Sequence, residues 1–216
     1  MQAKLILLAA GMLAAVATQA GALKVTVLDK EGKPVPDAVV VLAPAAPGAP
    51  KPLPTHVTIS QEKMRFVPAV SLVAVGAQAT FVNNDPWEHH VRASAAGLHS
   101  FDDAPGGGFE LRLDGKAAGK PAAVAEGRFD KAGPVLLGCH LHASMKAHVF
   151  VSDTPWAALS DDSGQASFEA VPEGLVRIKV WQADQLLDLP PQQLTLTAAP
   201  AAASVQLQVV PRRRRV

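Results

Sequence analysis

The feature that most restricts the fold of this chain is the spacing of its strand-breaking residues. Short valine-rich runs are interrupted every few residues by Pro, Gly, Asn or Asp. Examples are "HVTIS", "AQATFVNND" and "HHVRAS", which begin at residues 56, 77 and 89. The 216 residues include 18 prolines and 16 glycines, and no stretch shows a convincing helical period. Short strands at regular spacing predict an all-β fold, either a sandwich or a barrel.

The same pattern gives a strand map. Residues 23–44 are predicted as strand, turn and strand, and "RFVPAVSLVAV" (65–75) carries a further strand signal. Residues 95–131 are expected to hold one or two strands, "FELRL" among them, between long loops. "GPVLLGC" (133–139) is predicted as a buried strand and "KAHVFVSD" (146–153) as its antiparallel partner. A last series is expected at 165–171, 175–181, 192–197 and 204–210.

The N-terminus has the pattern of a secretory signal peptide. Lys4 precedes an uncharged apolar run from Leu5 to Ala17, and Ala20-Gly21-Ala22 offers small residues at a cleavage position,. We expect residues 1–22 to be removed near Ala20 or Ala22, although an uncut membrane anchor is the alternative. The mature protein is then predicted in the periplasm, with no stable membrane insertion after cleavage.

The charge balance argues against nucleic acid as a partner. Without Lys4, the 20 basic residues of the chain become 19, against 19 acidic residues, so the net charge of the mature chain is about zero. A basic tail (211–216) with Arg212 to Arg215 is expected to be a solvated end rather than a docking element,. Cys139 is the single cysteine, so it must be a buried thiol, an intermolecular link or a ligand.

Several metal-ligand side chains gather in "GCHLHASMKAHVFV" (138–151), which joins two predicted strands. Cys139, His142 and Met145 follow one another at intervals of three, so a loop that wraps around one point brings them together. A second imidazole must come from elsewhere, and His89 in "NNDPWEHHVRAS" is the candidate. Two imidazoles, one thiolate and a weak thioether are the set that suits copper. The alternative is a core cysteine with incidental surface histidines.

The remaining histidines are expected to be ordinary polar residues. His90 and His140 adjoin ligand candidates, so on extended backbone their side chains point the opposite way. His148 falls on the outgoing strand, and His56 and His99 lack partners at ligand spacing. A role for His90, His140 or His148 as a second or competing copper ligand stays open.

The motif Cys139-x-x-His142-x-x-Met145 resembles the copper loop of the cupredoxins, in particular that of amicyanin and its relatives. "FVNNDPWEHHV" resembles the other ligand segment of that family, with His89 at the ligand position and His90 where the family has Asn. These segments, with "FDKAGPVLLGCHLHASM" and "VFVSDTPW", also resemble exported bacterial plastocyanin-like proteins often labelled as methylamine-utilization proteins. The stretch between His89 and Cys139 is longer than in amicyanin-like members.

The cupredoxin resemblance implies a Greek-key β-sandwich with one copper ion, Cu(I) or Cu(II), held by His89, Cys139, His142 and Met145. It implies a one-electron carrier that meets a redox protein partner transiently and passes electrons through the partly exposed edge of His142. Leu141, Ala143 and Ser144 would border the docking patch.

The segments on either side of this unit resemble the two halves of one module. "DDSGQASFEAVPEGLVRIKVW" (161–181) is similar to the second half of a transthyretin-like or carboxypeptidase-regulatory-like β-sandwich, and "VTVLDKEGKPVPDAVVVLAP" (25–44) to its first half. Neither flank alone has enough strands to bury a core. We therefore predict a smaller sandwich from 23–44 and 153–210, a Pro-rich linker at 45–54, and an inserted cupredoxin domain at 55–152. The alternative is that the first two strands join the cupredoxin sheet.

Three function classes follow from this chain. The preferred prediction is a periplasmic blue copper electron carrier. The first alternative is a copper buffer or chaperone without electron transfer, and the second is a structural β-sandwich module with a vestigial copper site. No enzymatic activity is expected, because four protein ligands leave no open position for a substrate.

Overall fold

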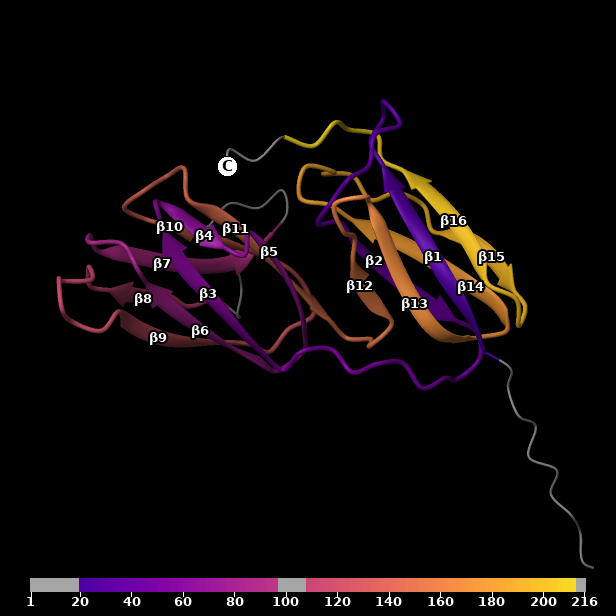
Figure 1. Cartoon of the computed structure of the whole chain (residues 1–216), viewed down its shortest axis with the longest axis horizontal. Coiled ribbons are helices and arrows are strands. Elements are labelled where there is room, and N and C mark those ends of the chain that lie inside the picture. The colour runs from indigo at the N-terminus through magenta and orange to yellow at the C-terminus, as the bar shows by residue number, and fades with distance from the viewer. Residues whose placement is uncertain (1–19, 97–107, 213–216) are drawn as a thin grey trace, which may run out of the picture.

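The computed structural model describes residues 20–96 and 108–212, and all the regular structure in these ranges is β. The described strands form four sheets, which Figure 1 displays as two lobes lying side by side. In the described ranges, no helix has the length and hydropathy that a membrane crossing requires. The predicted all-β class is therefore confirmed.

The first lobe is a pair of sheets that share one core. A five-stranded sheet has the order β5 (Val70–Ala74), β11 (Lys146–Ser152), β10 (Gly133–Cys139), β7 (His89–Ala95) and β8 (Glu110–Leu113). A four-stranded sheet has the order β4 (Arg65–Val67), β3 (His56–Glu62), β6 (Ala77–Asn83) and β9 (Ala123–Phe129). Alternate side chains of both sheets, such as Phe81, Leu137 and Val149, are buried between them,.

The second lobe is built from the two ends of the described chain. Its three-stranded sheet has the order β13 (Gln165–Pro172), β1 (Ala20–Leu28) and β16 (Ala201–Gln206). Its four-stranded sheet has the order β12 (Ala157–Leu159), β2 (Val39–Pro44), β14 (Gly174–Trp181) and β15 (Gln192–Leu196). Val25 of β1, Val40 of β2 and Ile178 of β14 belong to one buried cluster, so the two sheets share a core.

These pairings bear on the proposed insertion. β1 pairs with β13 and β16, whereas β10, which carries Cys139, pairs with β7 and β11. The described part of the chain thus begins in the second lobe, passes through β3 to β11 in the first, and returns. The alternative in which the first two strands join the cupredoxin-like sheet is not what the pairings show. The insertion, the domain boundaries and the resemblance of the second lobe to a regulatory module stay predictions.

Most predicted strands are present, including the antiparallel pair at 133–139 and 146–153, but three details were wrong. The run 65–75 is not one strand: Pro68 has no N–H to donate, and β4 and β5 on either side of it lie in different sheets,. The last strand is Ala201–Gln206 rather than 204–210, because parallel pairing with β1 outweighs the weak strand propensity of its alanines,. The short strand β12 was not predicted.

The predicted signal peptide falls mostly outside the described residues. Its last three residues, 20–22, belong to β1, where Ala20 and Gly21 are paired with Pro172 and Val171. Cleavage near Ala20 or Ala22 stays a prediction.

Candidate metal centre

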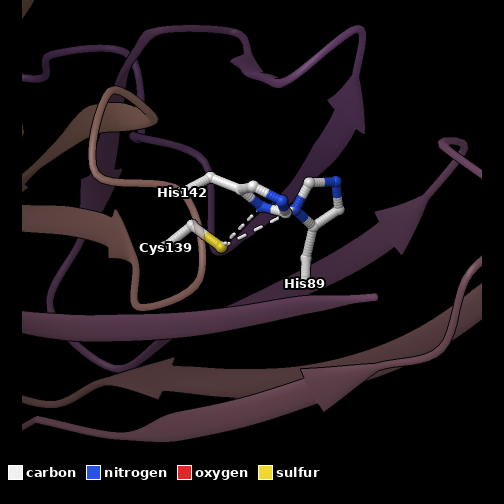
Figure 2. Close-up of side chains that lie close together, drawn as sticks. All are labelled: His89, Cys139 and His142. Atoms are coloured by element: carbon white, nitrogen blue, oxygen red, sulfur yellow. Dashed lines mark hydrogen bonds between the residues drawn. The ribbon is translucent and has the colours of Figure 1, made fainter. Parts of the chain in front are cut away.

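Three ligand candidates meet between the strands of the first lobe. Cys139 is the last residue of β10 and lies opposite Val91 of β7, so strand alternation puts the side chains of Cys139 and His89 on the same, inward face,. His142 reaches the same point from the loop that follows β10. Figure 2 shows the three side chains pointing toward one another.

The loop from Cys139 to Met145 is closed by its own backbone. The N–H of His142 donates to the carbonyl of Cys139, the N–H of Met145 to that of His142, and the N–H of Cys139 to that of Met145. The β10–β11 ladder ends just outside this loop, at the pair Gly138 and Lys146. Cys139 and His142 are therefore held at a fixed separation by backbone hydrogen bonds.

The three inward atoms form a nearly equilateral triangle. The Sγ of Cys139 lies 3.6 Å from Nδ1 of His89 and 3.4 Å from Nδ1 of His142, and the two Nδ1 atoms are 3.2 Å apart. The point equidistant from three corners so spaced lies about 2.0 Å from each, close to the roughly 2.0–2.3 Å of metal bonds to imidazole and thiolate,. The donor set and its size therefore fit a first-row transition metal ion,.

His89 is held from behind by a carboxylate. Its Nε2 lies 3.0 Å from Oδ2 of Asp85, and both side chains are buried. An imidazole that donates one N–H to a carboxylate keeps the lone pair of its other nitrogen for a metal. The Asp85 contact thus favours the tautomer of His89 in which Nδ1 is unprotonated and faces Cys139.

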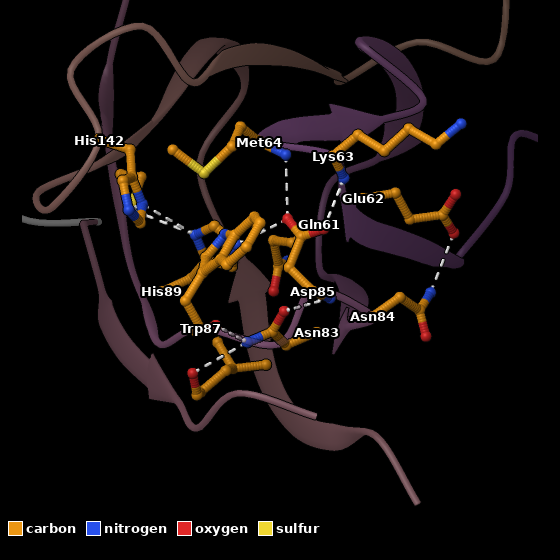
Figure 3. Close-up of polar contacts among 12 residues, drawn as sticks. Gln61, Glu62, Lys63, Met64, Asn83, Asn84, Asp85, Trp87, His89 and His142 are labelled. Carbon is orange, nitrogen blue, oxygen red and sulfur yellow. Dashed lines mark hydrogen bonds and ion pairs between the residues drawn. The ribbon is translucent and has the colours of Figure 1, made fainter. Parts of the chain in front are cut away.

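Asp85 also accepts two backbone hydrogen bonds, from the N–H groups of Lys63 at 2.6 Å and Met64 at 3.0 Å. Burial alone raises the pKa of Asp85, but the bonds from Met64, His89 and Lys63 outweigh it, so the pKa lies below 3.8,. Lys63 and Met64 both have positive φ, at 52° and 62°. The carboxylate thus ties His89 to the left-handed turn between β3 and β4 (Figure 3).

Asn83 fixes the turn in which Asp85 lies. Its Oδ1 accepts the N–H of Asp85 at 3.0 Å, and its Nδ2 lies 2.8–3.2 Å from the carbonyl oxygens of Trp87, Leu113 and Asp114. The sequence did not indicate a role for the Lys63–Met64 turn. This turn could not be recognised from its own residues, because the carboxylate that accepts its N–H groups belongs to Asp85, more than twenty residues away.

Met145, the fourth candidate, lies at the end of the same loop as Cys139 and His142. It is 1% exposed and belongs to the same buried cluster as Cys139. Its backbone N–H and carbonyl close the loop from Cys139 to Met145. Its role as an axial ligand stays a prediction.

The centre is buried on one side and open on the other. His89 and Cys139 are buried, whereas His142 is partly exposed and is followed by exposed Ala143 and Ser144. Leu141 and Trp87, which neighbour His142 and His89 in sequence, are 47% and 45% exposed. Access to the three atoms from solvent therefore passes His142.

None of the other histidines in residues 20–96 and 108–212 belongs to this cluster. The rings of His90 and His140 contact each other, as strand alternation predicts, and His148 contacts Trp181. His56 lies 3.1 Å from the hydroxyl of Thr80. His99 lies outside the described residues.

Comparison with known proteins gives structural likenesses only, since no family model and no curated protein matches this chain. The copper-containing nitrite reductase of Thermus scotoductus SA-01 is 24% identical with a TM-score of 0.36, over 52% of this chain and 26% of that one. Amicyanin from Paracoccus versutus is 22% identical with a TM-score of 0.34, over 51% of this chain and 97% of that one. A purple cupredoxin from Nitrosopumilus maritimus is 17% identical with a TM-score of 0.35, over 44% and 99%. Because these identities are below 25% and the TM-scores below 0.5, no functional conclusion is taken from them.

Proposed function

We propose that this protein is an exported copper protein that carries one electron at a time. The observation that supports it is the triangle of Cys139, His89 and His142, whose edges of 3.2–3.6 Å suit a single metal ion that the three atoms would hold together. The copper ion supplies the one-electron couple when it is bound. The side chains and the backbone of this chain hold the ion and control access to it.

The protein contributes rigidity. The ligand loop is closed by three backbone hydrogen bonds, and His89 is clamped between the strand β7 and the Asp85 carboxylate. A site that cannot follow the different geometric preferences of Cu(I) and Cu(II) changes little during electron transfer. The reorganisation energy, which opposes electron transfer, would therefore be small.

The protein also limits access to the metal centre to one side. His89 and Cys139 are shielded by the core, so the partly exposed ring of His142 is the shortest route between the ion and a partner. Leu141, Ala143 and Ser144 border that ring and are exposed. We propose that a redox protein docks there transiently, since small and weak contacts are typical of such encounters.

Met145 is proposed as the weak fourth ligand. Four protein ligands would leave no position for a substrate, so the protein is proposed not to be an enzyme.

The closest competing function is a copper buffer or chaperone, and the two make opposite demands on the site. A carrier must keep its ion while it cycles, and a chaperone must release it. The test is voltammetry of the copper-loaded protein on an electrode, followed by incubation of the reduced protein with a Cu(I) chelator. A reversible one-electron wave with copper retained over hours supports the carrier. Rapid loss of copper to the chelator, without a reversible wave, overturns it.

A further inference from the structure

His90 and His140 form a second pair of imidazoles on the face of the five-stranded sheet opposite to the metal centre. Each follows a ligand candidate directly, His90 after His89 and His140 after Cys139. The N–H of His140 donates to the carbonyl of His90 at 2.9 Å, so the two residues are cross-strand neighbours. Their side chains consequently leave the sheet on the same side, away from the core.

The two imidazole pairs have closely similar geometry. The rings of His89 and His142 have centroids 4.9 Å apart and an interplanar angle of 68°. The rings of His90 and His140 have centroids 5.5 Å apart and an interplanar angle of 64°. The two pairs thus differ by only 0.6 Å in the distance between ring centroids and by 4° in interplanar angle.

The hydrogen bonding of His90 repeats that of His89. The Nε2 of His90 lies 3.1 Å from Oε2 of Glu110, as Nε2 of His89 lies 3.0 Å from Asp85. The residue His90 is only 9% exposed, and its Nδ1 atom is buried without a hydrogen-bond partner. A buried ring nitrogen without a partner costs free energy, and an imidazole backed by a carboxylate is the usual form of a metal-binding histidine.

We propose that His90 and His140 form a second metal site, which takes a borderline divalent cation such as Cu²⁺ or Zn²⁺. The Nδ1 atom of His90 is one ligand, the exposed ring of His140 supplies the other, and water completes the coordination. Glu110 orients the His90 ring from behind. Glu110 is itself held by Arg92, whose Nε lies 2.8 Å from Oε1. This site is independent of the proposed electron transfer at Cys139.

The test counts copper in the purified protein. Equilibrium dialysis against Cu²⁺ is compared for the wild type, His140→Ala and the matched control His56→Ala, which removes another exposed histidine of the same lobe. Electron spin resonance of the same samples reports the type of each copper. We expect one copper with an ordinary tetragonal spectrum in the wild type and the control, and its loss in His140→Ala, with any thiolate-linked copper unchanged.

Because the tetragonal copper is counted separately, failure of the Cys139 centre would not hide this site. Absence of such a copper in the wild type, or its persistence in His140→Ala, overturns the proposal. A second variant tests the carboxylate: Glu110→Gln should raise the dissociation constant of the tetragonal copper about tenfold or more. Glu126→Gln, which changes an exposed carboxylate of β9, should leave it unchanged. An unchanged constant in Glu110→Gln would contradict the proposed arrangement.

Discussion

The substitution Asp85→Asn tests how His89 is prepared for a metal. The carboxylate accepts hydrogen bonds from Nε2 of His89 at 3.0 Å and from the N–H groups of Lys63 and Met64. Asparagine has nearly the same shape but only one acceptor oxygen. If that oxygen serves a backbone N–H, the amide NH₂ faces His89 and favours the tautomer with its proton on Nδ1, which cannot bind a metal.

The size of this effect follows from the contacts that are lost. Replacing a carboxylate that orients a metal-binding histidine typically costs about 10–100-fold in affinity, or about 1.4–2.7 kcal/mol. One backbone N–H of the turn is also left without a partner, which lowers the free energy of unfolding by about 1–3 kcal/mol. Both effects are expected from one exchanged atom.

The assay is a competition between the protein and a chromophoric chelator for copper, with thermal unfolding measured on the metal-free protein. Asp130→Asn is the matched control, because Asp130 is an exposed carboxylate that forms an ion pair with Arg128. We expect a higher dissociation constant in Asp85→Asn and an unchanged one in the control. A folded Asp85→Asn protein with wild-type copper affinity would refute the role of Asp85 and put His89 as a ligand in doubt.

Three further predictions concern the axial position, the core and one surface turn. Met145→Leu should keep copper bound but shift the reduction potential measured by voltammetry, at a cost in stability below about 1.5 kcal/mol; an unshifted potential would show that Met145 is not a ligand. Leu137→Ala, at a fully buried position, should lower the free energy of unfolding in urea by about 2–5 kcal/mol, and a loss below 1 kcal/mol would contradict the packing described. The Ser163 hydroxyl and the N–H of Gln165 hold the pKa of Asp161 below 3.8, so the stabilisation from Asp161 is present above its unfolded pKa and is lost as pH falls through the lower folded value. NMR titration should find this pKa raised in Ser163→Ala, and an equal pKa in both proteins would refute the assignment.

The convergence of Cys139 and His142 could be predicted from the sequence because it depends on local geometry. Cys139 and His142 lie in one short loop between two strands, and strand alternation separates His89 from His90 whatever the rest of the fold does. The same holds for the strand β14, where buried Val176 and Ile178 alternate with exposed Arg177 and Lys179.

The features that the sequence could not provide depend on contacts between distant segments. The turn at Lys63 and Met64 is stabilised by Asp85, more than twenty residues away. The two strands β1 and β2 were predicted correctly. Their placement in different sheets was not, because each finds its partners beyond residue 156. Long-range pairing of this kind outweighs local propensity, and a single sequence carries no direct record of it.

The most direct test of the central claim is the visible absorption and electron spin resonance of the mature protein loaded with Cu(II), compared with Cys139→Ser. The triangle of Cys139, His89 and His142 predicts a strong thiolate-to-copper absorption band and a narrow copper hyperfine splitting, both lost in the variant,. A pale, ordinary tetragonal copper spectrum that is the same in both proteins would contradict it. Copper would then be bound by histidines alone, and Cys139 would be a core thiol.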